Sequence, residues 1–351
     1  MDNKKKEIMN RYLKKIPLGN VIRHRKIKTP SPNDPDTPFV TVKSEKIYAT
    51  RIRNDWHFIL KGCGIENISD IKGLDDLKDI DIISLNLANN HLISIESLEK
   101  YKCLRNIKDL NVSYNTIYEM NGLSKFSKLT TLDLSHNRIR EIRGLVYCEK
   151  LGVLILNHNL ITSIQGLEFN AELEYLDLGH NKLTSTRGLE ANPKITRLYL
   201  NHNDLKGISG LNHLKSLEEI YLEFNKLESI EGISWKKLRK LDASSNYLTA
   251  LYLYDVEEGK QPYMTFKDNK IREIHCIYDY LLMSYLDLTG NEISELGWLE
   301  NICGEYVYLS GNRISSLDPK AWYVFKELHL EDNPIDPVNI PEFLGAAKVY
   351  Y

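Results

Sequence analysis

Apolar and polar residues alternate in a short phrase that returns every 22 residues between Leu129 and Asn225. The copies read LTTLDLSHNRI, LGVLILNHNLI, LEYLDLGHNKL, ITRLYLNHNDL and LEEIYLEFNKL, and each places an asparagine after the alternation. A period of two is the pattern of a short strand with one buried face. A fixed repeat of this length predicts a solenoid, in which each unit buries its apolar face against its neighbours.

The asparagine shows how much of the chain repeats. It recurs at spacings of 21 to 25 residues, at Asn90, Asn115, Asn137, Asn159, Asn181, Asn203, Asn225, Asn246, Asn269, Asn291, Asn312 and Asn333. This series predicts about twelve repeats in one continuous stack, although 351 residues would suffice for two ordinary domains. We expect each asparagine amide to be buried and to satisfy backbone groups in the bend, so that the stacked amides form a ladder.

Each repeat also predicts which residues face the core. In the repeat that begins at Leu129, Leu132 and Leu134 point inward from the strand, and Ile139, Ile142 and Leu145 return to the core on the convex side. Six successive repeats keep a glycine just before the last of these positions: Gly122, Gly144, Gly166, Gly188, Gly210 and Gly232. Later repeats lose it, and the segment from Leu251 to Tyr263 departs from the pattern, so the last third should be irregular.

The two ends of the chain predict segments that differ from the regular repeats. Residues 1–37 predict a basic arm and a proline-rich linker, and residues 38–80 an N-terminal cap, in which FVTV and KIYATRI form a hairpin and Phe58 to Ile65 a degenerate first repeat. The solenoid should occupy residues 81–335. The prolines of residues 336–351 prevent another regular repeat and predict a C-terminal cap that folds over the last one.

Charge and cysteine content bound the class of protein. The net charge is −2, but residues 1–60 carry 14 Lys and Arg against 6 Asp and Glu, which joins a basic arm to an acidic body. Five widely spaced cysteines without a CxxC pair favour reduced thiols rather than disulfides. The charged N-terminus resembles no signal peptide, so we expect a cytoplasmic protein, with the nucleus as the alternative.

The phrase LxxLxLxxNxI, followed by xxIxGL, resembles the short 22-residue class of leucine-rich repeats found in bacterial internalins and phosphatase regulators, over roughly residues 58–335. An intracellular chain of about twelve such repeats is most similar to the leucine-rich-repeat regulatory subunits of protein phosphatase 1. The resemblance implies the α/β class and a right-handed horseshoe with a concave parallel β-sheet that binds other proteins.

The repeat predicts which side chains line the concave face. The position before the first core leucine holds Ser84, Asp109, Thr131, Val153, Tyr175, Arg197, Glu219, Lys240, Tyr263, Tyr285, Tyr306 and Glu327. The position between the two leucines holds Asn86, Asn111, Asp133, Ile155, Asp177, Tyr199, Tyr221, Asp242, Thr265, Asp287, Tyr308 and His329. With strands about 4.8 Å apart, one tyrosine patch should form around Tyr199 and another from Tyr263, Tyr285, Tyr306 and Tyr308.

These columns suggest a binding surface. Tyrosines among charges are typical of interface hot spots, although aromatic residues also simply suit a solvated strand. The candidate partner-binding residues are Tyr175, Asp177, Arg197, Tyr199, Glu219, Tyr221, Glu223, Asp242, Tyr263, Tyr285, Asp287, Tyr306 and Tyr308. The hypothesis is a non-enzymatic scaffold, monomeric on its own, for a basic protein partner such as a phosphatase catalytic subunit. The alternative is a nucleic-acid- or membrane-associated adaptor localised by the arm, which could also fold back onto the acidic face.

Candidate chemistry is sparse. No phosphate-binding GxxxxGK[ST], GxSxG or HExxH motif is present, so we expect neither catalysis nor a cofactor. His136, His158, His180 and His202 precede four successive ladder asparagines. No carboxylate or cysteine joins them at ligand spacing, so the sequence favours a surface polar column, somewhat sensitive to pH, over a metal site.

Overall fold

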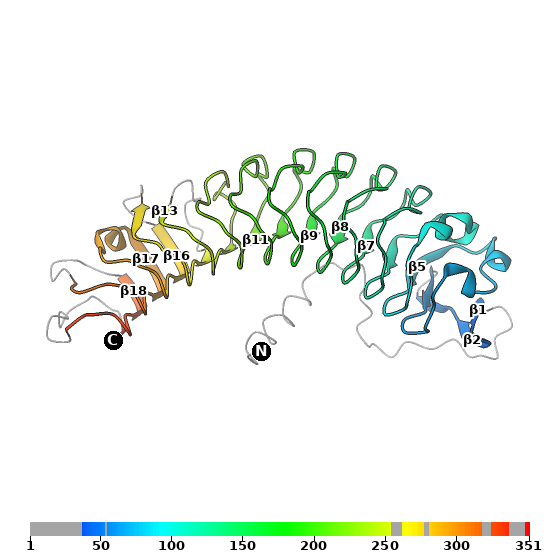
Figure 1. The fold of residues 1–351 in the computed structure, drawn as a ribbon, viewed down its shortest axis with the longest axis horizontal. Coiled ribbons are helices and arrows are strands. Elements are labelled where there is room, and N and C mark those ends of the chain that lie inside the picture. The colour runs from blue at the N-terminus through cyan, green and yellow to red at the C-terminus, as the bar shows by residue number, and fades with distance from the viewer. Residues whose placement is uncertain (1–36, 53–54, 254–261, 277–280, 318–323, 337–347) are drawn as a thin grey trace.

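A computed structural model describes residues 37–52, 55–253, 262–276, 281–317, 324–336 and 348–351. These residues form a parallel-sheet solenoid of about twelve turns with little helix, as predicted. The chain winds into an arch whose inner face carries the strands and whose outer face carries loops (Figure 1). The arm expected at residues 1–37 lies outside the described residues except for Thr37.

The inner face is one sheet of fifteen strands in the described residues. All neighbours from β4 to β19 are parallel, and β3 (Thr50–Ile52) pairs antiparallel with β4 at the N-terminal edge. The parallel strands are β4 (Asp55–Ile59), β5 (Ile82–Asn86), β6 (Asp109–Asn111), β7 (Thr131–Asp133), β8 (Val153–Ile155), β9 (Tyr175–Asp177), β10 (Arg197–Tyr199), β11 (Glu219–Tyr221), β12 (Lys240–Asp242), β14 (Tyr263–Thr265), β16 (Leu281–Asp287), β17 (Ile302–Tyr308), β18 (Val324–His329) and β19 (Lys348–Tyr350).

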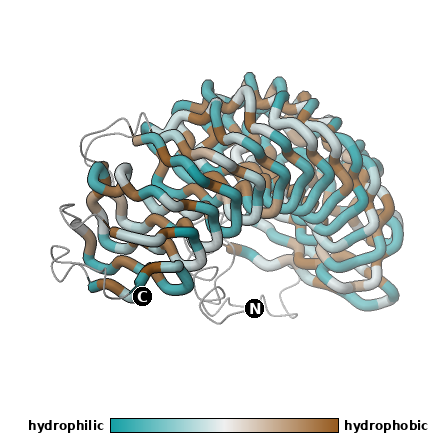
Figure 2. The backbone as a smooth tube through the Cα atoms, turned by 60° about the vertical axis from the view of Figure 1, so that its left-hand side comes forward, coloured by the Kyte–Doolittle hydropathy of each residue, from teal (hydrophilic) through white to brown (hydrophobic). Residues whose placement is uncertain are grey.

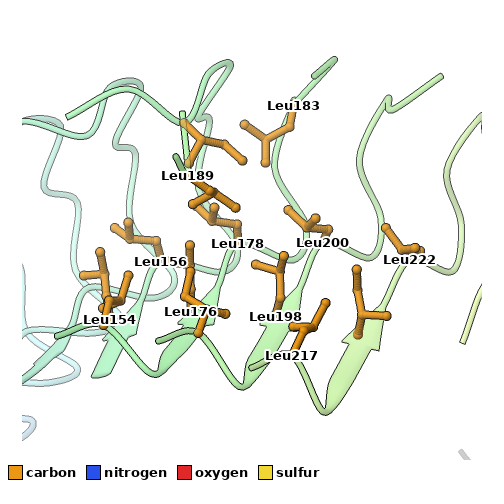
Figure 3. Close-up of a cluster of buried hydrophobic side chains, with 14 of the residues drawn as sticks. Leu154, Leu156, Leu176, Leu178, Leu183, Leu189, Leu198, Leu200, Leu217 and Leu222 are labelled. Carbon is orange, nitrogen blue, oxygen red and sulfur yellow. The ribbon is translucent and has the colours of Figure 1, made fainter. Parts of the chain in front are cut away.

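The core is built from the repeat leucines. Leu176 and Leu178 of one repeat are fully buried, as are Leu198 and Leu200 of the next, and they stack along the arch (Figure 3). Hydrophobic stretches recur at matching positions on successive turns (Figure 2). Each repeat therefore buries its apolar side chains against its two neighbours, which explains why a single repeat would not be stable alone.

The asparagine ladder joins each repeat to the one before it. The Asn181 Oδ1 accepts a hydrogen bond from the Ile161 backbone N–H at 2.9 Å, and its Nδ2 donates to the Leu156 and Leu178 carbonyls at 3.0 and 3.1 Å. All twelve ladder asparagines accept the equivalent bond from the preceding repeat. The predicted ladder is confirmed, and it satisfies backbone groups that the solenoid buries.

The outer side has little regular structure. Helix in the described residues is confined to the short 3₁₀ helices η1 (Ile68–Asp70), η2 (Asp75–Leu77), η3 (Glu96–Lys100), η4 (Lys102–Leu104) and η5 (Gly297–Asn301). A separate two-stranded parallel sheet joins β13 (Ala250–Leu253) to β15 (Glu273–Cys276). The start of the irregular segment from Leu251 to Tyr263 thus forms a strand, because Leu251 and Leu253 remain buried in the core.

The two ends differ from regular repeats. β1 (Phe39–Val42) and β2 (Glu45–Tyr48) form the predicted hairpin around Lys43 and Ser44, which have φ angles of 47° and 68°. Such left-handed values match the twist of a two-residue hairpin turn. At the other end β19 pairs in parallel with β18, so the last residues add a strand that the sequence analysis did not predict.

Candidate functional site

The register of the concave sheet is the one predicted from the repeat. Arg197 pairs with Tyr175 on one side and Glu219 on the other, and Tyr199 pairs with Asp177 and Tyr221. The same two columns continue from Ser84 on β5 to His329 on β18. The candidate side chains therefore lie on one face of one sheet, except that Glu223 follows the end of β11.

Three tyrosines form the first ring cluster. The rings of Tyr199 and Tyr221 stack with centroids 4.4 Å apart, and Tyr175 lies 5.2 Å from Tyr199 at a tilt. Tyr175 is only 8% exposed, so its ring mainly packs against Tyr199 and presents little area to a partner. Burial, with Glu219 and Asp177 nearby, raises the pKa of Tyr199 to about 12, so this hydroxyl keeps its proton at neutral pH.

A second cluster lies on the C-terminal strands. Tyr263 and Tyr285 stack at 4.1 Å, Tyr308 lies 5.1 Å from Tyr285, and the rings of His329 and Tyr350 continue the column at 4.3 and 4.4 Å. The sequence analysis placed His329 on the concave face but named neither His329 nor Tyr350 as a candidate site residue. The column could have been extended to His329 from the repeat, but Tyr350 belongs to the strand that was not predicted.

Tyr306 does not join this column, in contrast to the predicted patch. Its ring lies 5.2 Å from the Lys326 ammonium, which also donates a hydrogen bond to its hydroxyl at 3.0 Å. The stack passes from Tyr285 on β16 to Tyr308 on β17, which occupies the other column. Register alone therefore placed Tyr306 correctly on the concave face but not in the ring cluster.

Lys240 connects the two clusters. Its ammonium lies 4.8 Å from the ring centroid of Tyr221 and 5.4 Å from that of Tyr263, within range of cation–π attraction. Burial lowers the pKa of Lys240, and Asp242, Glu219 and Glu223 oppose that shift. The clusters and this lysine form one continuous feature, the concave ladder, which consists of Tyr175, Tyr199, Tyr221, Lys240, Tyr263, Tyr285, Tyr308, His329 and Tyr350.

The carboxylates beside the ladder have a structural role that the sequence analysis missed. Asp133, Asp177, Asp242 and Asp287 each accept a hydrogen bond at 3.0 Å from the backbone N–H two residues further on. Asn111 makes the same bond with Ser113. The signal in sequence is Asp or Asn followed two residues later by a small residue, which is the pattern of a local side-chain turn.

The electrostatics of the face follow from burial. Burial, aided by Asp133 and opposed by the Gly179 N–H, raises the pKa of Asp177 to about 7. The Arg197 Nε lies 3.8 Å from a Glu219 carboxylate oxygen, and the Tyr221 hydroxyl donates to the other oxygen of that carboxylate at 3.3 Å. Arg197 is thus neutralised by the face itself, which leaves carboxylates in excess.

A second column of rings runs along the edge of the solenoid, beside the asparagine ladder. We call it the edge column; it consists of Tyr114, His136, His158, His180, His202 and Phe224, whose adjacent centroids lie 4.0 to 4.4 Å apart. All six residues have a left-handed φ of 53° to 56°. The sequence analysis found the four histidines but missed the tyrosine and phenylalanine at the equivalent position.

The histidines of the edge column have lowered pKa values. Burial, followed by repulsion from the neighbouring histidines, lowers the pKa of His180 to about 4. Burial also lowers the pKa of His136, His158 and His202. The column is therefore uncharged at neutral pH. Within the described residues no three or more His, Cys, Asp or Glu side chains surround a common point as a metal site would require.

Comparison with known proteins identifies the class. A family model described as leucine-rich repeats in two copies matches residues 127–169 and 193–235, and a further leucine-rich repeat model matches residues 149–205. A comparison with curated proteins returned no match. These matches support a leucine-rich repeat protein, and the fold is that of a leucine-rich-repeat horseshoe.

Solved structures share the same architecture. An internalin, InlF, from Listeria monocytogenes is 20% identical with a TM-score of 0.66, and the alignment covers 84% of this chain and 86% of the internalin. A leucine-rich repeat protein from Leptospira interrogans is 21% identical with a TM-score of 0.54, covering 84% and 95%. A chain of the LRIM1/APL1C complex is 18% identical with a TM-score of 0.55, covering 76% and 59%. These identities show the fold alone.

Proteins of this fold are generally non-catalytic scaffolds for protein interactions. The rings and carboxylates of the candidate site lie along the extended concave face of the sheet. Among the described residues, no helix is long and apolar enough to cross a membrane.

Proposed function

We propose that this protein is a non-enzymatic scaffold that binds a protein partner with a basic surface through strands β9 to β18. The observation that carries the proposal is the concave ladder, in which rings at 4.1 to 5.2 Å and the Lys240 ammonium form one unbroken row. Rings held in this way lose little conformational entropy on binding, which favours tight association.

The charge of the face favours a basic partner. Arg197 is paired with Glu219, and Lys240 is occupied between two rings, whereas Asp177 and Asp242 keep a carboxylate oxygen beyond the one that binds the backbone. The second oxygen of Asp287 accepts a hydrogen bond from the Tyr285 hydroxyl at 3.3 Å. Arginine and lysine side chains of a partner can bind the oxygens of Asp177 and Asp242. Their contribution is chiefly to orientation and association rate, while the tyrosines supply most of the affinity.

A phosphatase catalytic subunit is the first partner to test. The support is the similarity of the repeat phrase and its 22-residue period to the regulatory subunits of protein phosphatase 1. One solved structure of this fold is itself a protein complex, LRIM1/APL1C, which supports a protein rather than a small molecule as the partner. We place the interaction in the cytosol or the nucleus.

The test compares the intact chain with the Tyr199→Ala/Tyr221→Ala double variant. Both tyrosines are only partly buried, so their loss should weaken binding by about 2 kcal/mol per central ring while leaving the core intact. Tyr147→Ala is the control, because this tyrosine is 60% exposed outside the concave sheet. Proteins captured from a lysate are identified by mass spectrometry, and the phosphatase catalytic subunit is sought by name.

A protein lost with the double variant and kept with Tyr147→Ala would support the concave face as the site. Equal capture by all three chains would contradict the proposal. A named phosphatase subunit among the proteins lost would support the specific partner, and its absence would reject that partner without rejecting the scaffold.

Charge asymmetry favours one second candidate, an adaptor localised by its arm. Residues 1–36 hold ten Lys and Arg against four Asp and Glu. Such a segment binds nucleic acid or an anionic membrane surface by charge, and that binding falls steeply with salt. Deleting residues 1–36 should abolish binding in this case, whereas a tyrosine-centred protein contact should persist in salt and survive the deletion.

A further inference from the structure

We propose that a cavity on the outer side of the solenoid binds an organic phosphate, which is a phosphate monoester joined to an apolar or aromatic group. The cavity has a volume of about 660 Å³ and is lined by residues between Ile93 and Leu160, from four successive repeats. A volume of this size suits a small ligand or a single large side chain. The site is separate from the concave ladder, because its residues follow the ladder asparagines on the way to the convex side.

Arg138 and Arg140 place two guanidinium groups on one side of the chain. Both arginines are exposed, whereas Ile139 between them is fully buried. This alternation is that of an extended segment, in which residues two positions apart point to the same side. Both arginines line the cavity.

The cavity also contains two carboxylates, but each of them already has a partner. Glu141 forms an ion pair with Arg143, and a Glu119 oxygen accepts a hydrogen bond from the Asn121 Nδ2 at 2.7 Å. Within the described residues, neither of the other two guanidinium groups takes part in a hydrogen bond or an ion pair. Two positive charges therefore remain for a ligand.

Equivalent positions elsewhere in the solenoid carry paired bases. Arg313 directly follows its ladder asparagine, as Arg138 does, and Arg272 lies three residues after its own, as Arg140 does. Both pair with a carboxylate oxygen of Glu292 in the repeat between them, at 3.0 and 2.8 Å. At the cavity, the equivalent positions of the adjacent repeats are uncharged: Thr116, Tyr118, Leu160 and Thr162. The repeat itself thus offers the cavity arginines no counter-charge.

Two adjacent guanidinium groups suit a phosphate better than a carboxylate. One guanidinium can satisfy both oxygens of a carboxylate, whereas a phosphate monoester has three oxygens and a charge of about −1.5 to −2 at neutral pH. The group joined to the phosphate would contact the apolar wall of the cavity. Ile93 and Tyr118 in this wall are 52% and 53% exposed, so they have area to offer a ligand.

The experiment titrates the full chain with phenyl phosphate by isothermal calorimetry at physiological ionic strength, where distant exposed charges are screened. The test variant is Arg138→Gln/Arg140→Gln, which removes both unpaired charges from exposed positions and leaves the core intact. We expect saturable binding by the intact chain and a loss of about tenfold or more in the variant. Benzoate, which carries the same ring on a carboxylate, should bind more weakly than phenyl phosphate.

Arg272→Gln/Arg313→Gln is the matched control, because it removes the same charge from the same positions of distant repeats. It should bind phenyl phosphate as the intact chain does. Ile93→Ser should weaken binding of phenyl phosphate and leave binding of inorganic phosphate unchanged. The proposal would be overturned by the absence of saturable binding, by an equal loss in the control, by benzoate binding as tightly as phenyl phosphate, or by an Ile93→Ser variant that binds phenyl phosphate normally.

A peptide with one phosphotyrosine among alanine and serine residues identifies the source of the phosphate. Tighter binding of this peptide than of phenyl phosphate would assign the cavity to a phosphorylated protein segment. Weaker binding would assign it to a free small molecule. The same peptide without the phosphate should not bind, and equal binding of the two peptides would count against a phosphate site.

Discussion

At the scale of single residues, short polar side chains in this solenoid mainly satisfy the backbone. Asn181 bonds backbone groups of four different residues inside the core, and Asp177 accepts the Gly179 N–H at the end of its strand. In the repeats that carry an aspartate or asparagine at this strand position, two residues four positions apart thus close the bend on both sides. An aspartate on the concave face is therefore part of the fold first and a ligand for a basic partner second.

Asp177 should make stability depend on pH. Its folded pKa of about 7 lies above the ordinary value of 3.8, so the folded chain binds the proton more tightly than the unfolded chain. This contribution to stability is fully present below pH 3.8 and is lost as pH rises through 7. Asp177→Asn should therefore stabilise the protein at pH 8, on the order of 1 kcal/mol after allowance for solvent screening, and have little effect near pH 4.

Urea unfolding at both pH values measures this difference. Asparagine is a suitable replacement because Asn111, at the equivalent position of β6 three strands from β9, makes the same backbone bond. Asp177→Ala is the control, since it removes the charge and the hydrogen bond together and should gain less at pH 8. A stability change for Asp177→Asn that does not vary with pH would contradict the burial of this carboxyl.

At the scale of elements, the glycine of the regular repeats sets how closely successive turns approach. Gly188 has φ +112°, and a Cβ there would overlap the Ile164 carbonyl oxygen of the preceding repeat. Gly210 occupies the equivalent position with φ +93°, yet a Cβ would meet nothing within 4 Å. Glycine at this position of the repeat is therefore required by its left-handed backbone in both repeats, and at Gly188 also by the close approach of the preceding repeat.

Alanine substitution separates these constraints. Gly210→Ala carries only the cost of a left-handed backbone and should destabilise the protein by about 1 kcal/mol. Gly188→Ala must also push two repeats apart and should cost about 3 kcal/mol or more. Urea unfolding followed by circular dichroism measures both, and equal costs would show that the turns are free to separate at Gly188.

The strands and the core follow from the sequence because their signal repeats. Twelve asparagines and paired leucines determine the register without ambiguity, and the concave columns came out as predicted. β13, β15 and β19 could not be predicted, because each occurs once and its pairing depends on distant segments. Ring contacts were predicted only in part, since rotamers decide whether Tyr285 stacks with Tyr306 or Tyr308.

At the scale of the whole molecule, two ring columns run along the arch on different surfaces. The edge column extends from the repeat of Tyr114 to that of Phe224, and the concave ladder extends from β9 to β19. They share only the repeats of β9 to β11. A solenoid can carry two such columns on different surfaces because equivalent positions of successive repeats stack in register.

From the charge distribution across the molecule we predict that the arm competes for the concave face. Residues 1–36 carry +6, which leaves −8 for residues 37–351. A fully extended segment of this length reaches about 120 Å, whereas β11 lies about 40 Å from the N-terminal edge of the sheet. A tethered segment acts at a millimolar effective concentration, so even a weak contact competes with a partner in solution.

Removing residues 1–36 should therefore strengthen binding of a basic partner, by about threefold to tenfold at low ionic strength. The gain should disappear in high salt, because it depends on exposed charges. A synthetic peptide of residues 1–36 added to the shortened chain should weaken its binding of the partner again. A peptide of the same composition in scrambled order tests whether charge alone suffices.

Fluorescence anisotropy with a labelled lysine- and arginine-rich peptide measures the affinity. Equal affinity of the two chains at low salt would show that the arm leaves the concave face open and serves another purpose.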